Sequence, residues 1–296
     1  MCAVCERPES TNVGQKEAFE KLGHQVECFN HRTLLVTTFK HTEEPLRETF
    51  GHFQYKMREF DPDLVLFCKT NELDEKFIKY ARQTATAVYW FPDPLATAMG
   101  FHASDLASAC DKAFVTSTPV VEYFTKLGAD CEQIIEGYRP DIYCRKSEKK
   151  QYDISFVGSA TPERQKAINQ IEGAGFRVAL YGYGWRGHHI EKADLGVECN
   201  VYNYSKLVLN LTRGNIFSDR VVKALACGAK VISQYCQDLV ELGFDKYVDL
   251  FNESNMVEVI RNALATEWTE SEIAGQLEWV SQFTWENQMQ KMVEKI

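Results

Sequence analysis

Short apolar runs and amphipathic stretches alternate along the first half of the chain. The apolar runs predict strands at 1–5, 25–29, 64–68, 87–91, 113–116 and 132–135, and helices are expected between them at 14–22, 43–60, 74–82, 104–110 and 119–127. The run at 64–68 is apolar throughout, as in a strand that is buried on both faces of a sheet. Repeated strand–helix units of this kind predict an α/β fold with a doubly wound, mostly parallel sheet.

A second series of the same kind follows residues 147–151, which are polar and lack a hydrophobic pattern. Strands are expected at 153–157, 176–181, 208–211 and 230–233, and helices after 161 and at 201–207, 218–227, 255–265 and 271–296. We therefore expect two Rossmann-like domains, one on each side of this polar segment. Ligands of such sheets bind at the carboxyl ends of the strands, which makes the cleft between the domains the candidate site.

The composition narrows the classes of protein to consider. Hydrophobic residues at 45% and charged residues at 25% are typical of soluble proteins, and no stretch approaches the roughly 18 apolar residues that span a bilayer. The N-terminus lacks the apolar segment of a signal peptide, so a cytoplasmic location is expected. A net charge of −9 argues against a protein that holds nucleic acid mainly through its phosphates, although a local basic cleft remains open.

The ten cysteines are scattered through apolar runs, and we expect them to be reduced core residues. Cys2 and Cys5 have CxxC spacing, but no second Cys/His pair matches them. Zinc binding and redox chemistry are therefore not expected at this pair. His188 and His189 likewise lack carboxylate or cysteine partners at a convincing spacing, and no metal site is expected there.

The segment SDRVVKALACGAKVIS, residues 218–233, is the most informative one. Ser218 suits an N-cap, because its hydroxyl can accept from the free N–H groups of the first turn, and Gly228 suits the left-handed residue after a helix. Arg220 and Lys223 add cations to a helix start that already favours anions. The segment indicates a phosphate site; a surface helix with solvated basic residues is the alternative.

Two glycine-containing turns support an anionic ligand. Gly158 and Ser159 stand between a strand and a helix, where backbone N–H groups can approach a phosphate, and Arg164 adds charge nearby. The sequence YGYGW, residues 181–185, offers aromatic rings that could stack on a base or sugar and glycines that let a ligand approach the backbone. Plain turns with local packing are the alternatives. GxGxxG, GxxxxGK[ST] and GxSxG are absent, which argues against a nicotinamide dehydrogenase, a P-loop enzyme and a serine hydrolase.

The first half contains one carboxylate that suits catalysis. Asp93 lies between two prolines at a strand end, where a rigid loop could aim a general base into the cleft. Gly14 opens the first predicted helix and could leave room for a substrate. A turn residue and a turn glycine are the alternatives for these two positions.

Read together, these segments resemble the GT-B glycosyltransferases, especially the CgeB-like spore-maturation group of the glycosyltransferase family 1/4 type. The resemblance rests on YDISFVGS with Arg164, LYGYGW, YNYSKLVLNLTRG and DRVVKALACGAKVIS; it is looser over KLGHQVECFN, DPDLVLF and YWFPDP. It implies GT-B architecture, with the nucleotide-sugar on a C-terminal domain of residues 147–270 and the acceptor on an N-terminal domain of residues 1–146. It also implies that the C-terminal helix 271–296 crosses back to join the N-terminal domain. It also implies that no metal or other cofactor is bound, because basic residues and helix N-termini hold the diphosphate.

The pattern and the resemblance together nominate the site residues. Donor-binding positions are expected at Gly158, Ser159, Arg164, Tyr181, Gly182, Tyr183, Arg213, Asn215, Ser218 and Asp219. Catalytic positions are expected at Asp93, Arg220 and Lys223, and acceptor-binding positions at Gly14 and Asp93. The family usually has a glutamate that bonds the donor ribose where this chain has Lys223, and its companion acidic position is Asn215. Because lysine cannot accept hydrogen bonds from ribose hydroxyls, altered donor recognition is expected, with loss of activity as the alternative.

The function expected from this reading is transfer of a hexosyl or pentosyl group from a nucleoside-diphosphate sugar to a hydroxyl. Arg164, Arg220 and Lys223 would neutralise the leaving diphosphate, and Asp93 would act as the base if the enzyme inverts configuration. The acceptor is open among a small molecule, a glycan, a protein and a hydroxymethylated DNA base. A catalytically inactive sugar-nucleotide-binding module and a nucleotide-sugar epimerase are the other function classes.

Overall fold

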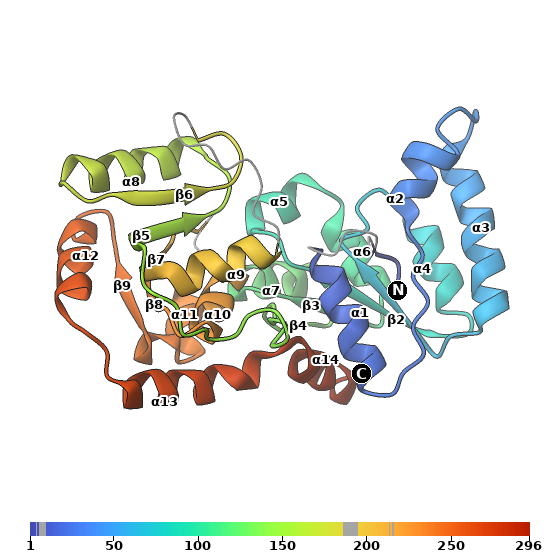
Figure 1. The fold of residues 1–296 in the computed structure, drawn as a ribbon. Coiled ribbons are helices and arrows are strands. Elements are labelled where there is room, and N and C mark those ends of the chain that lie inside the picture. The colour runs from blue at the N-terminus through green and yellow to red at the C-terminus, as the bar shows by residue number, and fades with distance from the viewer. Residues whose placement is uncertain (4, 6–9, 186–194, 213, 215) are drawn as a thin grey trace. The chain divides into compact units, whose positions relative to one another are not determined.

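The chain forms two compact units in a computed structural model, which describes residues 1–3, 5, 10–185, 195–212, 214 and 216–296. Unit 1 comprises Met1–Glu136 and Trp285–Ile296, and unit 2 comprises Gly137–Thr284 (Figure 1). No helix in the described part of the chain is both long enough and apolar enough to cross a membrane.

The unit boundaries differ from the predicted ones at 146/147 and 270/271. Residues that follow Glu136 bond to unit 2: the N–H of Tyr138 donates to the carbonyl of Phe283, and the Tyr143 hydroxyl donates to Glu198. The predicted helix 271–296 is two helices, α13 (Glu270–Val280) in unit 2 and α14 (Trp285–Glu294) in unit 1, with a short 3-10 turn between them. The last helix therefore completes the first unit, as the sequence predicts, but begins later.

Unit 1 is built on a parallel sheet with the strand order β1-β2-β3-β4. Its strands are β1 (Leu64–Cys68), β2 (Thr86–Phe91), β3 (Lys112–Val115) and β4 (Cys131–Gln133). Cys2 extends the sheet through parallel bridges to Phe67 and to Phe29. The segments 1–5 and 25–29 therefore take part in the sheet as isolated bridges, because backbone pairing is confined to the residues around Cys2.

Both faces of this sheet are covered, because side chains alternate along β1 and β2 between two apolar clusters. Val65 and Phe67 face a cluster that includes the helices α3, α4, α6 and α7. Leu66 and Cys68 face a second cluster supplied by α1 and α14. The bounds of the unit 1 helices are α1 (Thr11–Lys21), α2 (His31–Thr33), the π-helical turn Leu34–Thr38, α3 (Pro45–Phe60), α4 (Glu75–Ala81), α5 (Leu95–Gly100), α6 (Ala103–Ala109) and α7 (Thr118–Lys126).

Unit 2 is built on a five-stranded parallel sheet with the order β6-β5-β7-β8-β9. Its strands are β5 (Tyr152–Val157), β6 (Val178–Tyr181), β7 (Ser205–Asn210), β8 (Lys230–Gln234) and β9 (Val248–Phe251). β7 lies earlier in the chain than the predicted strand 208–211, and α9 (Leu195–Tyr204) starts before the predicted helix 201–207. Short apolar runs such as this one fit both periodicities, so their boundaries are poorly fixed by pattern.

Helices cover both faces of the unit 2 sheet (Figure 1). On one face, α8 (Pro162–Gly173) and α12 (Met256–Ala265) contribute Ile168, Ile171 and Ile260 to the core. On the other face, α10 (Asp219–Ala226) packs against β7, β8, α9 and α13. The remaining elements are α11 (Gln237–Glu241) and the 3-10 turns Phe244–Lys246 and Ser281–Phe283.

Candidate functional site

The carboxyl ends of β5 and β7 form the switch point of the unit 2 sheet. From β5 the chain enters α8 on one face, and from β7 it enters α10 on the other, while β5 and β7 lie side by side. The two connections diverge, and a crevice opens at such a point in doubly wound sheets. The side chains that meet there come from α8, α10 and the loops after β5, β6 and β7.

The guanidinium of Arg220 joins the two central strands at this point. Its Nε donates to the carbonyl oxygen of Val157 at 2.6 Å, and its Nη1 donates to Oδ1 of Asn210 at 2.5 Å. The guanidinium also lies 4.7 Å from the centroid of the Phe156 ring. Nη2 makes no hydrogen bond with the described residues. Arg220 is thus a buried, fixed cation with one unused donor group.

Arg164 lies beside the same ring but is bound differently. Its Nε and Nη2 donate to the carbonyl of Leu211 at 3.2 and 2.8 Å, and its Nη1 donates to the carbonyl of Ser159 at 2.9 Å. All three guanidinium nitrogens therefore bind the backbone and tie the loop after β5 to the loop after β7. These bonds give Arg164 a structural role, and its predicted phosphate contact stays a prediction. Thr161 caps α8 as predicted, since its hydroxyl accepts from the Arg164 N–H.

The glycines of the two turns are required for contact within the protein. A Cβ on Gly182, whose φ is +128°, would lie 2.4 Å from the carbonyl oxygen of Gly158. A Cβ on Gly158 would lie 2.8 Å from Nη2 of Arg220. The Gly158 N–H also donates to the carbonyl of Tyr181 at 2.7 Å. These glycines let two loops and a guanidinium approach one another, which is a different reason from the predicted approach of a ligand.

Only one ring of the YGYGW sequence is free to stack on a ligand. The Tyr181 hydroxyl is hydrogen-bonded to the Tyr152 hydroxyl at 2.9 Å, and the ring is buried. The Trp185 indole donates to the carbonyl of Gly158 at 2.8 Å and packs edge-on against Phe156. Tyr183 is 60% exposed. The Tyr181 ring is therefore packed inside the protein and its predicted ligand role stays a prediction, while Tyr183 has the more exposed ring.

Lys223 lies in a buried group of charges. Its Nζ lies 2.5 Å from a carboxylate oxygen of Asp219 and 3.5 Å from one of Glu198, and it faces the ring of Tyr143. Glu198 accepts from the hydroxyls of Tyr143 and Tyr202 at 2.5 and 2.6 Å. Side-chain exposure is 15% for Lys223, 14% for Glu198 and 30% for Asp219. The predicted contact of Lys223 with phosphate is thus replaced by contacts with two carboxylates.

The opposite charges of Lys223 and Asp219 stabilise each other's ionised form. Burial alone would lower the pKa of Lys223, but the charges of Asp219 and Glu198 raise it well above its usual value. Burial opposes ionisation of Asp219, but the charge of Lys223 outweighs burial and lowers the pKa of Asp219. One ammonium between two carboxylates carries a surplus negative charge, and Asp219 is the more exposed carboxylate. Nothing in the sequence near Lys223 points to Glu198, because only the packing of α9 against α10 brings the two together.

The start of α10 differs from the prediction in one detail. Ser218 occupies the N-cap position, but its side chain makes no capping hydrogen bond. Gly228 has a φ of +68°, as the prediction of a left-handed residue after the helix requires. The hydroxyl of Ser218 therefore does not satisfy the first N–H groups of the helix.

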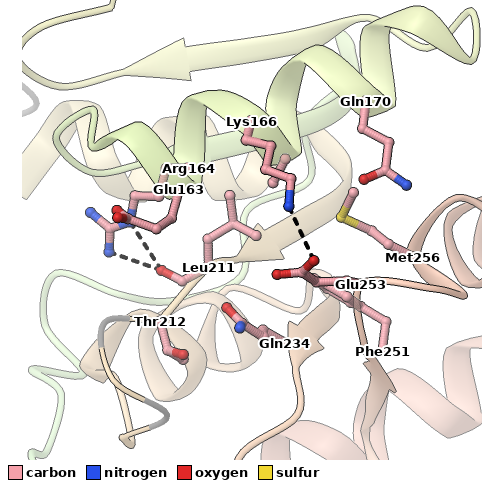
Figure 2. Close-up of a pocket in the computed structure, with 11 residues that line it drawn as sticks. Glu163, Arg164, Lys166, Gln170, Leu211, Thr212, Gln234, Phe251, Glu253 and Met256 are labelled. Atoms are coloured by element: carbon pink, nitrogen blue, oxygen red, sulfur yellow. Dashed lines mark hydrogen bonds and ion pairs between the residues drawn. The ribbon is translucent and has the colours of Figure 1, made fainter.

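A small cavity lies next to the switch point, between α8 and the ends of β7, β8 and β9 (Figure 2). Its volume is about 70 Å³, and the ion pair between Lys166 and Glu253, at 3.2 Å, lies across it. Ligand pockets for drug-sized molecules measure roughly 300–1,000 Å³, so this cavity is too small for a nucleotide-sugar. A larger hollow, about 630 Å³, lies along α8 and is lined by Ala160, Thr161, Pro162, Gln165, Asn169, Glu172 and Gly184.

In unit 1 the two predicted acceptor positions have different surroundings. Asp93 follows β2 and forms an ion pair with Lys69, which follows β1; both side chains are partly exposed. Gly14 lies inside α1, and a Cβ there would meet the Trp285 indole at 2.5 Å. Gly14 therefore lets α1 approach Trp285 closely, and its predicted acceptor role stays a prediction. Four other positions, Arg213, Asn215, His188 and His189, lie outside the described residues.

Comparisons with known proteins agree with this architecture. Residues 164–294 match the family model described as "Glycosyl transferase-like". No curated protein matches the chain. HepE from Anabaena, solved in complex with UDP-glucose, is 13% identical over 98% of this chain and 97% of its own, with a TM-score of 0.68.

Two further solved structures have the same fold. AviGT4, a glycosyltransferase involved in avilamycin A biosynthesis, is 13% identical over 96% of this chain and 87% of its own, with a TM-score of 0.63. A putative UDP-N-acetylglucosamine 2-epimerase from Listeria monocytogenes is 12% identical over 97% of this chain and 92% of its own, with a TM-score of 0.60. The chain therefore has the GT-B fold, and its residues 164–294 are similar to a glycosyltransferase-like family.

Proposed function

We propose that this protein transfers a sugar from a nucleoside-diphosphate sugar to a hydroxyl acceptor. The observation that carries the proposal is Arg220, whose guanidinium spans the ends of β5 and β7 and whose Nη2 makes no hydrogen bond with any described residue. In such a transfer the departing diphosphate gains negative charge as the bond to the sugar breaks. A cation already fixed in a water-poor site stabilises that charge without having to reorganise.

The other groups that we propose to contact the donor lie at the same edge of the unit 2 sheet. The first N–H groups of α10, which the Ser218 side chain leaves uncapped, would face the diphosphate together with Arg220. Asp219, held ionised by Lys223, would accept hydrogen bonds from hydroxyls of the nucleoside. Tyr183 would stack on the base. The UDP-glucose in HepE supports a uridine donor.

Several finer predictions rest on the sequence alone and stay predictions. They are the hexosyl or pentosyl nature of the transferred group, the independence from metal, the CgeB-like type and the cytoplasmic location. The acceptor also stays open, and duplex DNA with a hydroxymethylated base remains among the candidates. Binding of such a duplex should fall steeply with salt if phosphates are contacted, whereas absence of binding removes DNA from the list.

Arg220 and Arg164 make a matched pair for testing the phosphate contact, because both are equally buried and both lie against Phe156. We expect Arg220→Lys to weaken UDP binding by about 10- to 100-fold, the loss of one charge-assisted hydrogen bond. Arg164→Lys should change it by less than about 3-fold, because Arg164 faces the backbone. Calorimetric titration of UDP and of pyrophosphate, with circular dichroism to confirm folding, measures both. Equal losses in the two variants would contradict the assignment.

The role of Asp219 is tested with a nucleotide that lacks the ribose hydroxyls. Asp219→Asn should weaken binding of UDP but leave binding of 2′,3′-dideoxy-UDP unchanged. Equal weakening of both nucleotides would assign Asp219 a structural role only. Incubation of the wild-type protein with UDP-glucose, followed by analysis of the sugar product, separates a transferase that hydrolyses its donor slowly from an epimerase and from an inactive binding module.

A further inference from the structure

The thiols of Cys5 and Cys28 touch each other in unit 1. Their sulfur atoms are 3.0 Å apart, and both residues are partly exposed. The CxxC spacing pairs Cys5 with Cys2 in the sequence, but Cys2 is buried between Phe29 and Phe67 in the sheet. The structure thus gives Cys5 a different partner from the one that the spacing suggests, and this partner comes from the neighbouring segment.

The two thiols differ in pKa. The hydrogen bond with Cys5 is the largest cause that lowers the pKa of Cys28 to about 7; burial opposes it, and the N-terminal ammonium and Lys16 assist. The same hydrogen bond and burial raise the pKa of Cys5 above its usual value. Near neutral pH Cys28 is therefore partly ionised, while Cys5 stays a thiol. A thiolate next to a second thiol is the arrangement that exchanges with an external disulfide.

We propose that Cys5 and Cys28 are a redox modification site that closes to an intramolecular disulfide when a small-molecule disulfide, such as oxidised glutathione, is present. The Cys28 thiolate attacks one sulfur of the oxidised glutathione, forms a mixed disulfide and releases one glutathione thiolate. The Cys5 thiol then loses its proton and attacks the Cys28 sulfur, which releases the second glutathione. Two protein thiols are oxidised, and one glutathione disulfide is reduced to two thiols.

The structure favours a disulfide between Cys5 and Cys28 over a metal site and over a disulfide at a second thiol pair. The described residues contain no group of three or more His, Cys, Asp or Glu side chains that could hold a metal ion. A second thiol pair, Cys199 and Cys227 in unit 2, has a sulfur–sulfur distance of 4.0 Å, and both residues are about 1% exposed. That pair is closed to an oxidant in solution and serves as an internal control for access.

The disulfide would close a loop that contains the whole of α1, the helix that covers one face of the sheet together with α14. The disulfide would therefore hold Cys5 next to Cys28 and would resist local unfolding of α1. The modification acts on unit 1 and does not depend on the proposed sugar transfer.

Peptide mapping of the full-length protein tests the proposal. The reduced protein is incubated with oxidised glutathione, remaining thiols are blocked with N-ethylmaleimide, and the digest is analysed by mass spectrometry. We expect one cross-linked peptide that joins Cys5 and Cys28, lacks two hydrogen atoms and disappears with dithiothreitol, while Cys199 and Cys227 stay alkylated. Cys2→Ser should leave the link in place, and Cys28→Ser should abolish it. A link between Cys2 and Cys5, separate glutathione adducts on Cys5 and Cys28, or no oxidation at all would overturn the proposal.

A second measurement does not require the disulfide to form. The rate of alkylation of Cys28 by iodoacetamide should follow a titration near pH 7 in the wild-type protein. Cys5→Ala removes the hydrogen-bonded thiol and should move that titration toward higher pH. An unchanged profile would show that the two thiols are not coupled in solution, which contradicts the proposal.

Discussion

The carboxyl ends of the two sheets differ in the charged side chains that they hold and in how deeply these are buried. In unit 2 that edge holds two buried guanidiniums, both bound to backbone carbonyls and both stacked on Phe156. In unit 1 the corresponding edge holds the partly exposed ion pair of Lys69 and Asp93. A buried, hydrogen-bonded cation keeps its place without a ligand, whereas an exposed ion pair is screened by salt and contributes little to stability. The contrast teaches that the charged groups at the proposed donor site are held in place before a ligand binds. Those at the proposed acceptor site can change position more easily.

The largest loss of stability that we expect to bear on this contrast follows from replacing Lys223. Replacement by Met leaves Asp219 and Glu198 without their cation, and removal of one partner from a buried ion pair costs about 3 kcal/mol. Lys206→Met is the control, because Lys206 pairs with Asp153 on the surface of the same unit and should lose less than about 1 kcal/mol. Urea unfolding at neutral pH measures both free energies. Similar losses would mean that the Lys223 group is solvated.

Gly182→Ala tests whether the loops after β5 and β6 are as tightly packed as the glycines indicate. The added Cβ meets the carbonyl of Gly158 and forces a non-glycine residue to a φ of +128°, so a loss of about 2–3 kcal/mol is expected. Gly173→Ala is the matched control in α8, where a Cβ meets nothing within 4 Å and a small gain is expected. If Gly182→Ala melts like the wild type, the two loops are not in contact.

Gly14→Ala probes the corresponding tight contact in unit 1. The added Cβ meets a side chain, the Trp285 indole, rather than backbone, so α1 and α14 can move apart slightly and a loss of about 1–2 kcal/mol is expected. Gly51→Ala in α3, where the Cβ meets open space, should stabilise. Thermal unfolding of the two variants compares them. A loss of acceptor binding with normal stability would instead restore Gly14 as an acceptor residue.

The smallest expected effect concerns acid sensitivity in unit 1. Burial opposes ionisation of Glu72, but the hydrogen bond with His31 and the charge of Arg32 outweigh it and lower the pKa of Glu72 from 4.5 to about 2. The stabilisation is therefore complete above pH 4.5 and is lost as the pH falls toward 2. Because Glu72 is 40% exposed, solvent screening limits the contribution to about 1 kcal/mol. Glu72→Gln should remove that part of the pH dependence in urea unfolding measured between neutral and acidic pH, and parallel curves would exclude it.

The sequence predicts the layers of the fold better than the roles of the polar residues. Buried strands such as Leu64–Cys68 and the turn glycine Gly228 follow from local rules, since apolar runs and left-handed turns leave a direct trace in the sequence. By contrast, the sequence around a cation near a helix start does not indicate which residue that cation will bind. Arg164 and Lys223 looked alike as phosphate ligands, yet Leu211 and Glu198, both distant in sequence, decide what they bind.

The same limit explains the cysteines. The CxxC spacing draws attention to Cys2 and Cys5, whereas the contact that forms is between Cys5 and Cys28. The parallel bridge between Cys2 and Phe29, with hydrogen bonds from Met1 and Ala3 to the same segment, brings residue 28 beside the N-terminal residues. A pairing of this kind depends on sheet register, which the sequence pattern did not resolve for these short segments.

The membership of α14 in unit 1 has a consequence for the order of events during synthesis. Trp285, Met289 and Met292 complete the apolar cluster over Leu66, Val88 and Trp90. While the chain is being translated, that face of the first sheet stays uncovered until α14 has left the ribosome. Unit 2, which is continuous from Gly137 to Thr284, has all its residues available earlier. The usual sequence, in which the N-terminal domain matures first, is therefore expected to be reversed in this protein.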